Sequence, residues 1–523
     1  MRFSPVLKSS PHCLPSPDGR WIATLRPSSV VIREVESLNV FRSIKLSTAF
    51  AGNVTTFVWS PSSERILLAS AHEIHVFSAA DANFHATIRS PSSSTARSTF
   101  IDFGATDREA CICSAHGIKL SIFNLTTSKV VEISNPKFHT TVSAARGFSF
   151  RRRTHHLALL TRTSGRDTIS IHSPDSREVQ RSWNPDVIDA QGLSWTPDGK
   201  WLAVWESASQ GHKVLFFTPD GHKYRDWCGP LQHASGEVQD RLGAGVKLVA
   251  FSADSQYMAI GDFSRCISVL HTSITTQQLL LHHPTVLEPK DTVQIWQEQI
   301  DSASKGDVAT FPFVQASQPV SPPGRAPGGT SELKSGPHTI LFDCSAALVA
   351  VILDDAPSTL WIWDVSVVEL RAVLMFHSEI SRVEWHPVQS ELLFVKCEGN
   401  NYNGVIFIWD PLSGGPQTMD FRSLLPDRKT GGKSSVFWLK SNREPASLFF
   451  ADGKNCLLAS LADTDEEALP WQEHQPTPSI NMNQPTESPL DIMPGSAEES
   501  DESSDLGVGE LDDTFHFKKN GIE

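Results

Sequence analysis

Short apolar strands alternate with polar turns along most of this chain. The recurring unit is an apolar strand that ends in an aromatic residue, a turn of Ser, Pro, Asp or Gly, and a second apolar strand. Pro fixes φ in such turns, Asp or Ser accepts a local hydrogen bond, and Gly tolerates positive φ. Clear copies are VTTFVWSPSSERILLAS from Val54, AQGLSWTPDGKWLAVWE from Ala190, VKLVAFSADSQYMAIGD from Val246 and ISRVEWHPVQSELLFVK from Ile380. The pattern predicts a series of antiparallel β-hairpins.

The hairpins recur at a nearly constant spacing. The aromatic residues assigned to the position before each turn are Trp59, Phe103, Phe148, Trp195, Phe251, Phe342, Trp385 and Trp438. A ninth unit begins the chain, with Pro15 in the aromatic position. The commonest spacing is about 44 residues, which matches one four-stranded propeller blade. Large aromatic side chains at this position suit the space between neighbouring blades.

Two literal Trp-Asp pairs, Trp363-Asp364 and Trp409-Asp410, end strands within the repeats. Together with the phase of the hairpins, they predict an all-β WD40 β-propeller of about nine repeat units. Nine units fit one large ring, or a seven-bladed ring plus a partial second one. Ring closure is favoured because it removes exposed sheet edges.

Two segments depart from the rhythm of the propeller, which we assign to residues 1–462. An insertion at about 301–337 is rich in Pro, Gly and Ser and is expected to be a surface loop, while Thr292–Ile300 before it could form one more edge strand. Residues 463–523 are expected to be a disordered acidic tail, because 463–513 hold 15 acidic residues and no Lys or Arg. Within this tail, candidate phosphorylation sites are Thr477, Ser488 and Ser496.

Charge and motifs indicate a protein without chemistry of its own. The net charge of −14 resides in the tail, since residues 1–462 carry equal numbers of acids and bases, so neither DNA nor RNA is an expected partner. There is no apolar run long enough to span a membrane, and no membrane partner is expected.

Nucleotide-loop, metalloprotease, serine-hydrolase and CxxC motifs are missing, so we expect no enzyme, catalytic residue, cofactor or metal. The run Arg151–Arg153 is either a solvated turn or a small patch for anionic partners.

The order of several motifs resembles one known family. These motifs are MRFSPVLK at the N-terminus, GLSWTPDGKWLAVWES, KVLFFTPDGHKYRDW, and the stretch from Gly245 that ends at His283-Pro284 before the long insertion. They resemble the WD-repeat family whose vertebrate member is encoded antisense to a p53-related gene, over residues 1 to about 460.

The resemblance implies a non-catalytic scaffold at the microtubule organising centre, either a spindle pole body or a centrosome, in the cytoplasm and cytoskeleton. Such a scaffold helps anchor microtubule minus ends and organise the mitotic spindle. The implied partners are a coiled-coil microtubule-anchoring protein and a minus-end-directed kinesin-14, with an indirect association with microtubules. The alternative is a WD-repeat adaptor in another complex, as a translation-factor or ubiquitin-ligase substrate subunit.

Overall fold

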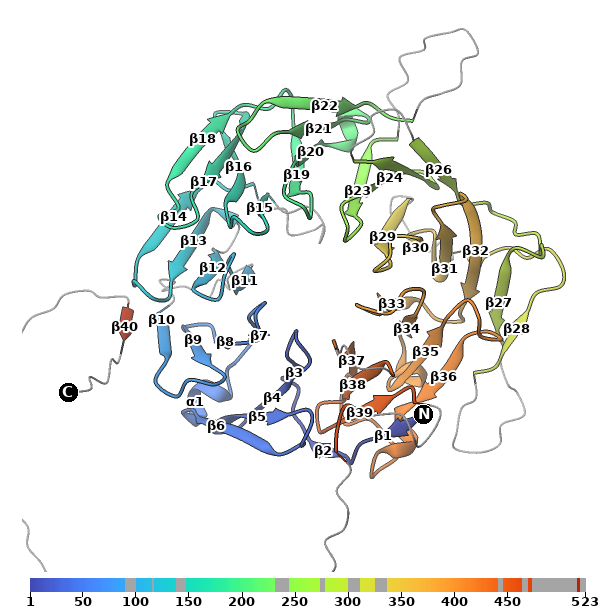
Figure 1. Ribbon diagram of the computed structural model, residues 1–523, viewed down its shortest axis with the longest axis horizontal. Coiled ribbons are helices and arrows are strands. Elements are labelled where there is room, and N and C mark those ends of the chain that lie inside the picture. The colour runs from blue at the N-terminus through green and yellow to red at the C-terminus, as the bar shows by residue number, and fades with distance from the viewer. Residues whose placement is uncertain are drawn as a thin grey trace, which may run out of the picture.

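Nine sheets, called blades 1 to 9 here, surround one axis in a single ring (Figure 1). The structure, a computed structural model, describes residues 1–89, 100–114, 117–137, 147–230, 244–272, 278–299, 311–324, 336–440, 445–462, 469–472 and 515–517. Its short helices are α1 (Thr48–Ala51), η2 (Ala208–Gln210), η3 (Asn400–Tyr402) and η4 (Phe421–Leu424). None of the described helices is long and apolar enough to cross a membrane. The propeller prediction is confirmed, and the alternative of a seven-bladed ring with a partial second ring is wrong.

Blades 1 to 5 are each built from consecutive strands, with the first strand nearest the axis (Figure 1). Blade 1 contains β3 (Cys13–Pro15), β4 (Trp21–Arg26), β5 (Ser29–Glu34) and β6 (Val40–Lys45). Blade 2 contains β7 (Thr56–Trp59), β8 (Arg65–Ala69), β9 (Glu73–Ser78) and β10 (His85–Arg89). Blade 3 contains β11 (Phe100–Phe103), β12 (Glu109–Cys113), β13 (Lys119–Asn124) and β14 (Val130–Ser134). Blade 4 contains β15 (Phe148–Phe150), β16 (Leu157–Thr163), β17 (Arg166–His172) and β18 (Val179–Trp183). Blade 5 contains β19 (Ala190–Trp195), β20 (Leu202–Glu206), β21 (Val214–Phe217) and β22 (Lys223–Trp227).

Blades 6 and 8 follow the same plan, whereas blades 7 and 9 are modified. Blade 6 contains β23 (Val246–Phe251), β24 (Tyr257–Asp262), β25 (Cys266–His271) and β26 (Gln278–His282). Blade 7 contains β29 (Pro337–Phe342), β30 (Leu348–Leu353), β31 (Ala356–Asp364) and β32 (Glu369–Met375), extended outward by β27 (Gln294–Glu298) and β28 (Phe313–Gln315). Blade 8 contains β33 (Ile380–Trp385), β34 (Leu393–Cys397), β35 (Val405–Trp409) and β36 (Gln417–Asp420). Blade 9 contains β37 (Ser435–Trp438), β38 (Ser447–Ala451) and β39 (Asn455–Ser460).

The N-terminus closes the ring by completing blade 9. Strands β1 (Arg2–Phe3) and β2 (Leu7–Lys8) both pair antiparallel with β39. Ser4, between them, donates its backbone N–H to the Leu458 carbonyl (2.9 Å), and its hydroxyl accepts the Leu458 N–H (2.8 Å). The two ends of the propeller are therefore held together in one sheet.

The middle strands are apolar on both faces because the neighbouring blades cover both. Every residue of β30 and β34 is buried, and the outer strand β18 is mostly exposed. Of the eight predicted repeat aromatics, six are buried, while Phe251 and Phe342 are half-buried. These side chains thus lie mainly in the core.

Three of the tryptophans also bond to the blade that precedes their own. The Trp59 indole N–H donates to the Leu14 carbonyl (3.2 Å), and that of Trp385 donates to the Leu341 carbonyl (3.0 Å). Trp438 repeats the contact with Glu384 (3.1 Å). In each case the acceptor lies one residue before the position that, in the preceding blade, corresponds to the tryptophan. The indole therefore joins neighbouring blades through a polar contact as well as through packing.

One repeat aromatic was assigned two residues too early. Trp59 pairs with Ile66 and Trp195 with Leu202, seven residues later in each case, and in blade 4 the residue in this register is Phe150, which pairs with Leu157. Phe148 and Phe150 lie on the same side of β15, because side chains of a strand alternate with a period of two. Hydrophobic pattern alone therefore does not distinguish them.

In the Trp-Asp pairs the tryptophan is buried in the core and the aspartate accepts hydrogen bonds in the following turn. Trp363 and Trp409 are buried, and the Trp363 indole N–H donates to Nε2 of His283 (3.0 Å), which follows the last strand of blade 6. Burial lowers the pKa of His283 to about 4, so its ring is neutral and accepts this bond. Asp364 and Asp410 accept backbone N–H groups of the following turns instead.

The predicted insertion loop is partly structured. Strand β27 forms where one more strand was expected and runs parallel to β32, but it is not an edge strand, because β28, which lies within 301–337, pairs with its other side. Phe311 and Phe313 explain this difference, because both rings pack against the core of blades 7 and 8. Residues 300–310 and 325–335 lie outside the described part.

The segment expected to be a tail contacts the ring where it is described. Trp471 is 3% exposed and packs with Val35 and Leu439, and the Gln472 N–H donates to the Glu36 carbonyl (2.7 Å). Farther on, β40 (Phe515–Phe517) pairs with β10 at the outer edge of blade 2. The packed core thus includes Trp471, beyond the boundary assigned at 462. Residues 463–468, 473–514 and 518–523 lie outside the described part.

The inter-blade indole bond can be isolated by a matched pair of substitutions. We expect Trp385→Phe to lower the free energy of unfolding by about 1 kcal/mol more than Trp195→Phe, because the buried Trp195 indole N–H has no partner in the described part. Both changes remove the same atoms from a buried site, so the difference reports the bond to Leu341. Equal losses in chemical denaturation would show that this bond contributes nothing.

Candidate binding surface on the crossover face

Antiparallel pairing places the loops of each blade alternately at the two ends of its strands. Turns between the first and second strands, and between the third and fourth, form what we call the turn face. Loops between the second and third strands, and the connections to the next blade, form the crossover face. Two clusters of charged residues on the crossover face differ in whether their charges are paired.

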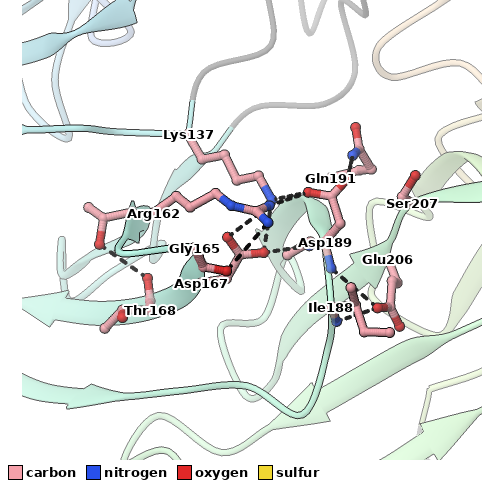
Figure 2. A network of polar contacts seen from close by, with 12 residues as sticks. Lys137, Arg162, Gly165, Asp167, Thr168, Ile188, Asp189, Gln191, Glu206 and Ser207 are labelled. Atoms are coloured by element: carbon pink, nitrogen blue, oxygen red, sulfur yellow. Dashed lines mark hydrogen bonds and ion pairs between the residues drawn. The ribbon is translucent and has the colours of Figure 1, made fainter. Parts of the chain in front are cut away.

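The first cluster, the ion-pair latch, joins blades 3, 4 and 5 (Figure 2). Lys137, on the connection from blade 3, donates to Asp167 of β17 (2.8 Å) and to Asp189, just before β19 (2.6 Å). Arg162 also donates to Asp189 (2.6 Å), and Asp167 accepts the Ala190 N–H (2.7 Å). Figure 2 shows both basic side chains converging on the two aspartates.

The charges of the latch are satisfied internally. Lys137 and Asp167 are buried, and a buried ion pair is tolerated when each partner is compensated. Burial alone would raise the pKa of Asp189, but Lys137 and Arg162 bond to it and lower that pKa overall. A cluster with paired charges holds three blades in place and leaves little to attract a ligand.

The second cluster surrounds an open cleft of about 1240 Å³ between blades 8 and 9. It is lined by Lys396 and Cys397 at the end of β34, by residues of the loop from Glu398 to Asn403, and by residues of the segment from Asp420 to Lys433. We call this the blade 8–9 cleft. Its basic residues are Lys396, Arg422, Arg428, Lys429 and Lys433, and its acidic residues are Glu398, Asp420 and Asp427. The lining therefore has a formal excess of positive charge.

Lys396 is the unusual residue of the cleft. It is 9% exposed, its ammonium donates to the Ser434 carbonyl, and within the described residues it forms no ion pair with a carboxylate. Burial, together with the positive charges of Lys433 and Arg382, lowers the pKa of Lys396 to about 8. The positive charges near Lys396 thus destabilise its ammonium form, whereas Lys137 is paired with two carboxylates.

The loop that carries Lys433 is held in place by backbone and side-chain bonds. The Asn403 amide donates to the Thr430 hydroxyl (2.7 Å) and the Gly432 carbonyl (2.8 Å), and its oxygen accepts the Ser434 N–H (2.9 Å). The Gly431 N–H donates to the Asp452 carboxylate (2.8 Å). The backbone beside the exposed lysines is therefore fixed by contacts to both blades.

The residues predicted from sequence do not form this cleft. The repeat aromatics are core residues of the ring, and Arg151–Arg153 lies on the turn face. Arg151 donates to the Gly199 carbonyl (2.7 Å) and its guanidinium lies 5.4 Å from the Trp195 ring centre, while Arg152 and Arg153 are exposed. Arg151 is thus tied into the blade contact, and the other two arginines remain available.

The signal for the cleft was present in the sequence but was not used. The run DRKTGGK, from Asp427, concentrates three basic residues and two glycines in a connection between blades, and Lys396 interrupts an apolar strand. The candidate phosphorylation sites Thr477, Ser488 and Ser496 lie outside the described residues. Among the described residues, no group of three or more His, Cys, Asp or Glu side chains is placed to hold a metal ion.

Comparison with known proteins supports the WD-repeat assignment. The chain is 26% identical over 430 residues to the WD repeat-containing protein WRAP73 of Mus musculus, covering 79% of this chain and 87% of the relative. It is 22% identical over 409 residues to an uncharacterised WD repeat-containing protein of Schizosaccharomyces pombe, covering 76% of this chain and 77% of the relative. No profile of a known protein family matches the chain. The chain is thus similar to WD repeat-containing proteins of a vertebrate and a fungus.

Two solved structures align with most of this chain at low similarity. One, described as a eukaryotic initiation factor, has a TM-score of 0.48 at 12% identity and covers 80% of this chain and 90% of its own. The other is the Cps50 (Swd1) β-propeller domain of Myceliophthora thermophila, with a TM-score of 0.35 at 12% identity, covering 78% of this chain and 99% of its own. The fold assignment here rests on the strand pairing of the ring.

The lowered pKa of Lys396 predicts a pH-dependent stability. Between about pH 8 and 10 the unfolded chain binds more protons at this lysine than the folded chain, so the free energy of unfolding should rise with pH. We expect Lys396→Met to reduce that rise by on the order of 1–3 kcal/mol, and the exposed Lys45→Met variant to keep it. Denaturant unfolding at several pH values measures both; the same rise in all three proteins would contradict the assignment.

Proposed function

We propose that this WD-repeat protein is a non-catalytic docking scaffold at the microtubule organising centre, either a spindle pole body or a centrosome. It helps anchor microtubule minus ends and organise the spindle, in a complex with a coiled-coil anchoring protein and a minus-end-directed kinesin-14. The observation that carries the proposal is the order of repeat motifs from the N-terminus to His283-Pro284, which resembles that of one WD-repeat family. Similarity to WRAP73 across 79% of the chain supports a relationship that spans most of the propeller.

The architecture supports a docking role. The blades are joined by the latch, by the indole bonds and by β1 and β2 paired with β39, which we call the N-terminal clasp. Such a ring offers separate surfaces at fixed positions relative to one another. Rigid surfaces lower the entropic cost of binding because few groups must be ordered when a partner arrives. A scaffold that holds an anchor and a motor at the same time needs this property.

Charge supports an indirect association with microtubules. Proteins that bind the acidic microtubule surface directly usually present a basic surface or tail. In this chain residues 1–462 are formally neutral, and 463–513 carry 15 acids and no Lys or Arg. A partner with its own basic segment would supply the attraction to the lattice, and the propeller would hold that partner at the pole.

Imaging of a fluorescently tagged chain in dividing cells tests the proposal. We expect one focus at each spindle pole, and we expect the foci to persist after microtubules are depolymerised, because the chain is held by the pole complex rather than by the lattice. Depletion of the coiled-coil partner should disperse them. A diffuse signal, or cofractionation with translation or ubiquitin-ligase complexes without polar foci, would favour the adaptor alternative and contradict the proposal.

A further inference from the structure

The blade 8–9 cleft contains a buried positive charge that has no negative partner in the described part of the chain. An ammonium group loses hydration when it is buried, and proteins usually compensate that loss with a carboxylate. The Lys137 ammonium of the latch has two carboxylates within 2.8 Å, whereas Lys396 has the Ser434 carbonyl and no carboxylate partner among the described residues. The same ring therefore compensates one buried lysine and leaves the other facing a cleft.

Further positive charges surround Lys396. Arg428, Lys429 and Lys433 are exposed, line the cleft, and form no ion pair within the described residues. Arg422 does not add to them, because its guanidinium holds both oxygens of Asp420 (2.8 and 2.6 Å). An anion in this cleft would meet several donors at once, on a loop that Asn403 already holds in place.

The acids of the cleft restrict what kind of anion fits. Glu398 and Asp427 line the same cleft and form no ion pair among the described residues, so a ligand with negative charge along its whole length would be repelled by them. A ligand with its charge concentrated in one group avoids this repulsion. Phosphate has this property, because it carries about −1.5 to −2 charge and three acceptor oxygens on one side chain.

The size and composition of the cleft indicate a peptide as the carrier of that phosphate. A volume of about 1240 Å³ is larger than most small-ligand pockets, and an isolated ion would fill a small part of it. Among the described residues, the lining contains no aromatic side chain, so it lacks the rings on which proteins stack the bases of single-stranded RNA. Its Asn, Ser, Thr and Gly groups suit the polar backbone of an extended peptide.

We propose that the blade 8–9 cleft binds a phosphorylated peptide segment of a partner protein, with the phosphate beside Lys396 and Lys433. The contacts are charge-assisted hydrogen bonds from the two ammonium groups, supported by the charges of Lys429 and Arg428. The buried position of Lys396 strengthens its interaction with the phosphate, because water screens less there. The site does not depend on where in the cell the protein resides, so it stands or falls separately from the spindle-pole proposal.

Retention of degenerate peptide pools on the immobilised full-length protein tests this site. Three pools have phosphoserine, serine or glutamate at a fixed central position between degenerate flanks. We expect the phosphoserine pool to be retained about tenfold or more over the other two. Equal retention of the glutamate pool would overturn the phosphate assignment, and equal retention of the serine pool, or no retention of any pool, would overturn the site.

Matched charge reversals locate the binding. Lys429→Glu/Lys433→Glu changes two exposed residues of the cleft, and Arg152→Glu/Arg153→Glu changes two exposed residues on the turn face. We expect the first variant to lose retention by about tenfold and the second by less than about twofold, with unchanged melting temperatures. Loss in the turn-face variant alone would assign the binding to that face and overturn the proposal. So would a labelled oligouridylate that binds the wild type and competes with the phosphoserine pool at similar concentrations.

Discussion

The ring closes because the N-terminal strands β1 and β2 pair antiparallel with β39 of the last repeat. Without β1 and β2, strand β39 would expose an unpaired edge, and the contact between blades 9 and 1 would lack its covalent support. The bonds of Ser4 to Leu458 span almost the whole chain. Each blade can then press against two neighbours, so the middle strands can be apolar on both faces, and this burial is the main stabilising term.

Joining nine sheets face to face leaves polar groups at every boundary, and the ring satisfies them in different ways. At the end of the first strand in blades 2, 8 and 9, a Trp indole N–H donates to a backbone carbonyl of the preceding blade. On the crossover face, Lys137 bridges Asp167 and Asp189. The blade 8–9 boundary differs, because Lys396 there has no carboxylate partner among the described residues. This difference between equivalent boundaries is the reason to assign binding to one and structural support to the other.

Local patterns predicted the blades well, because strand periodicity and turn chemistry depend on neighbouring residues. Trp59, Trp385 and Trp438 were placed at the ends of first strands from sequence alone. Phe148 was placed one strand period early, since period-two alternation puts Phe150 on the same side. Sequence alone leaves the number of rings open, because closure depends on pairing between residues more than 450 positions apart. The basic run from Arg428 to Lys433 is visible in the sequence, but its place beside Lys396, which precedes Lys433 by 37 residues, depends on the packing of blades 8 and 9.

Removal of the N-terminal clasp tests whether the ring depends on this pairing. We predict that a chain lacking residues 1–8 unfolds at a lower denaturant concentration and less cooperatively than the full chain, with faster hydrogen exchange in β37, β38 and β39. A synthetic peptide of residues 1–12 added in trans should restore protection of β39. An unchanged unfolding midpoint, a single unchanged transition and unchanged exchange in blade 9 would show that the ring does not depend on this clasp.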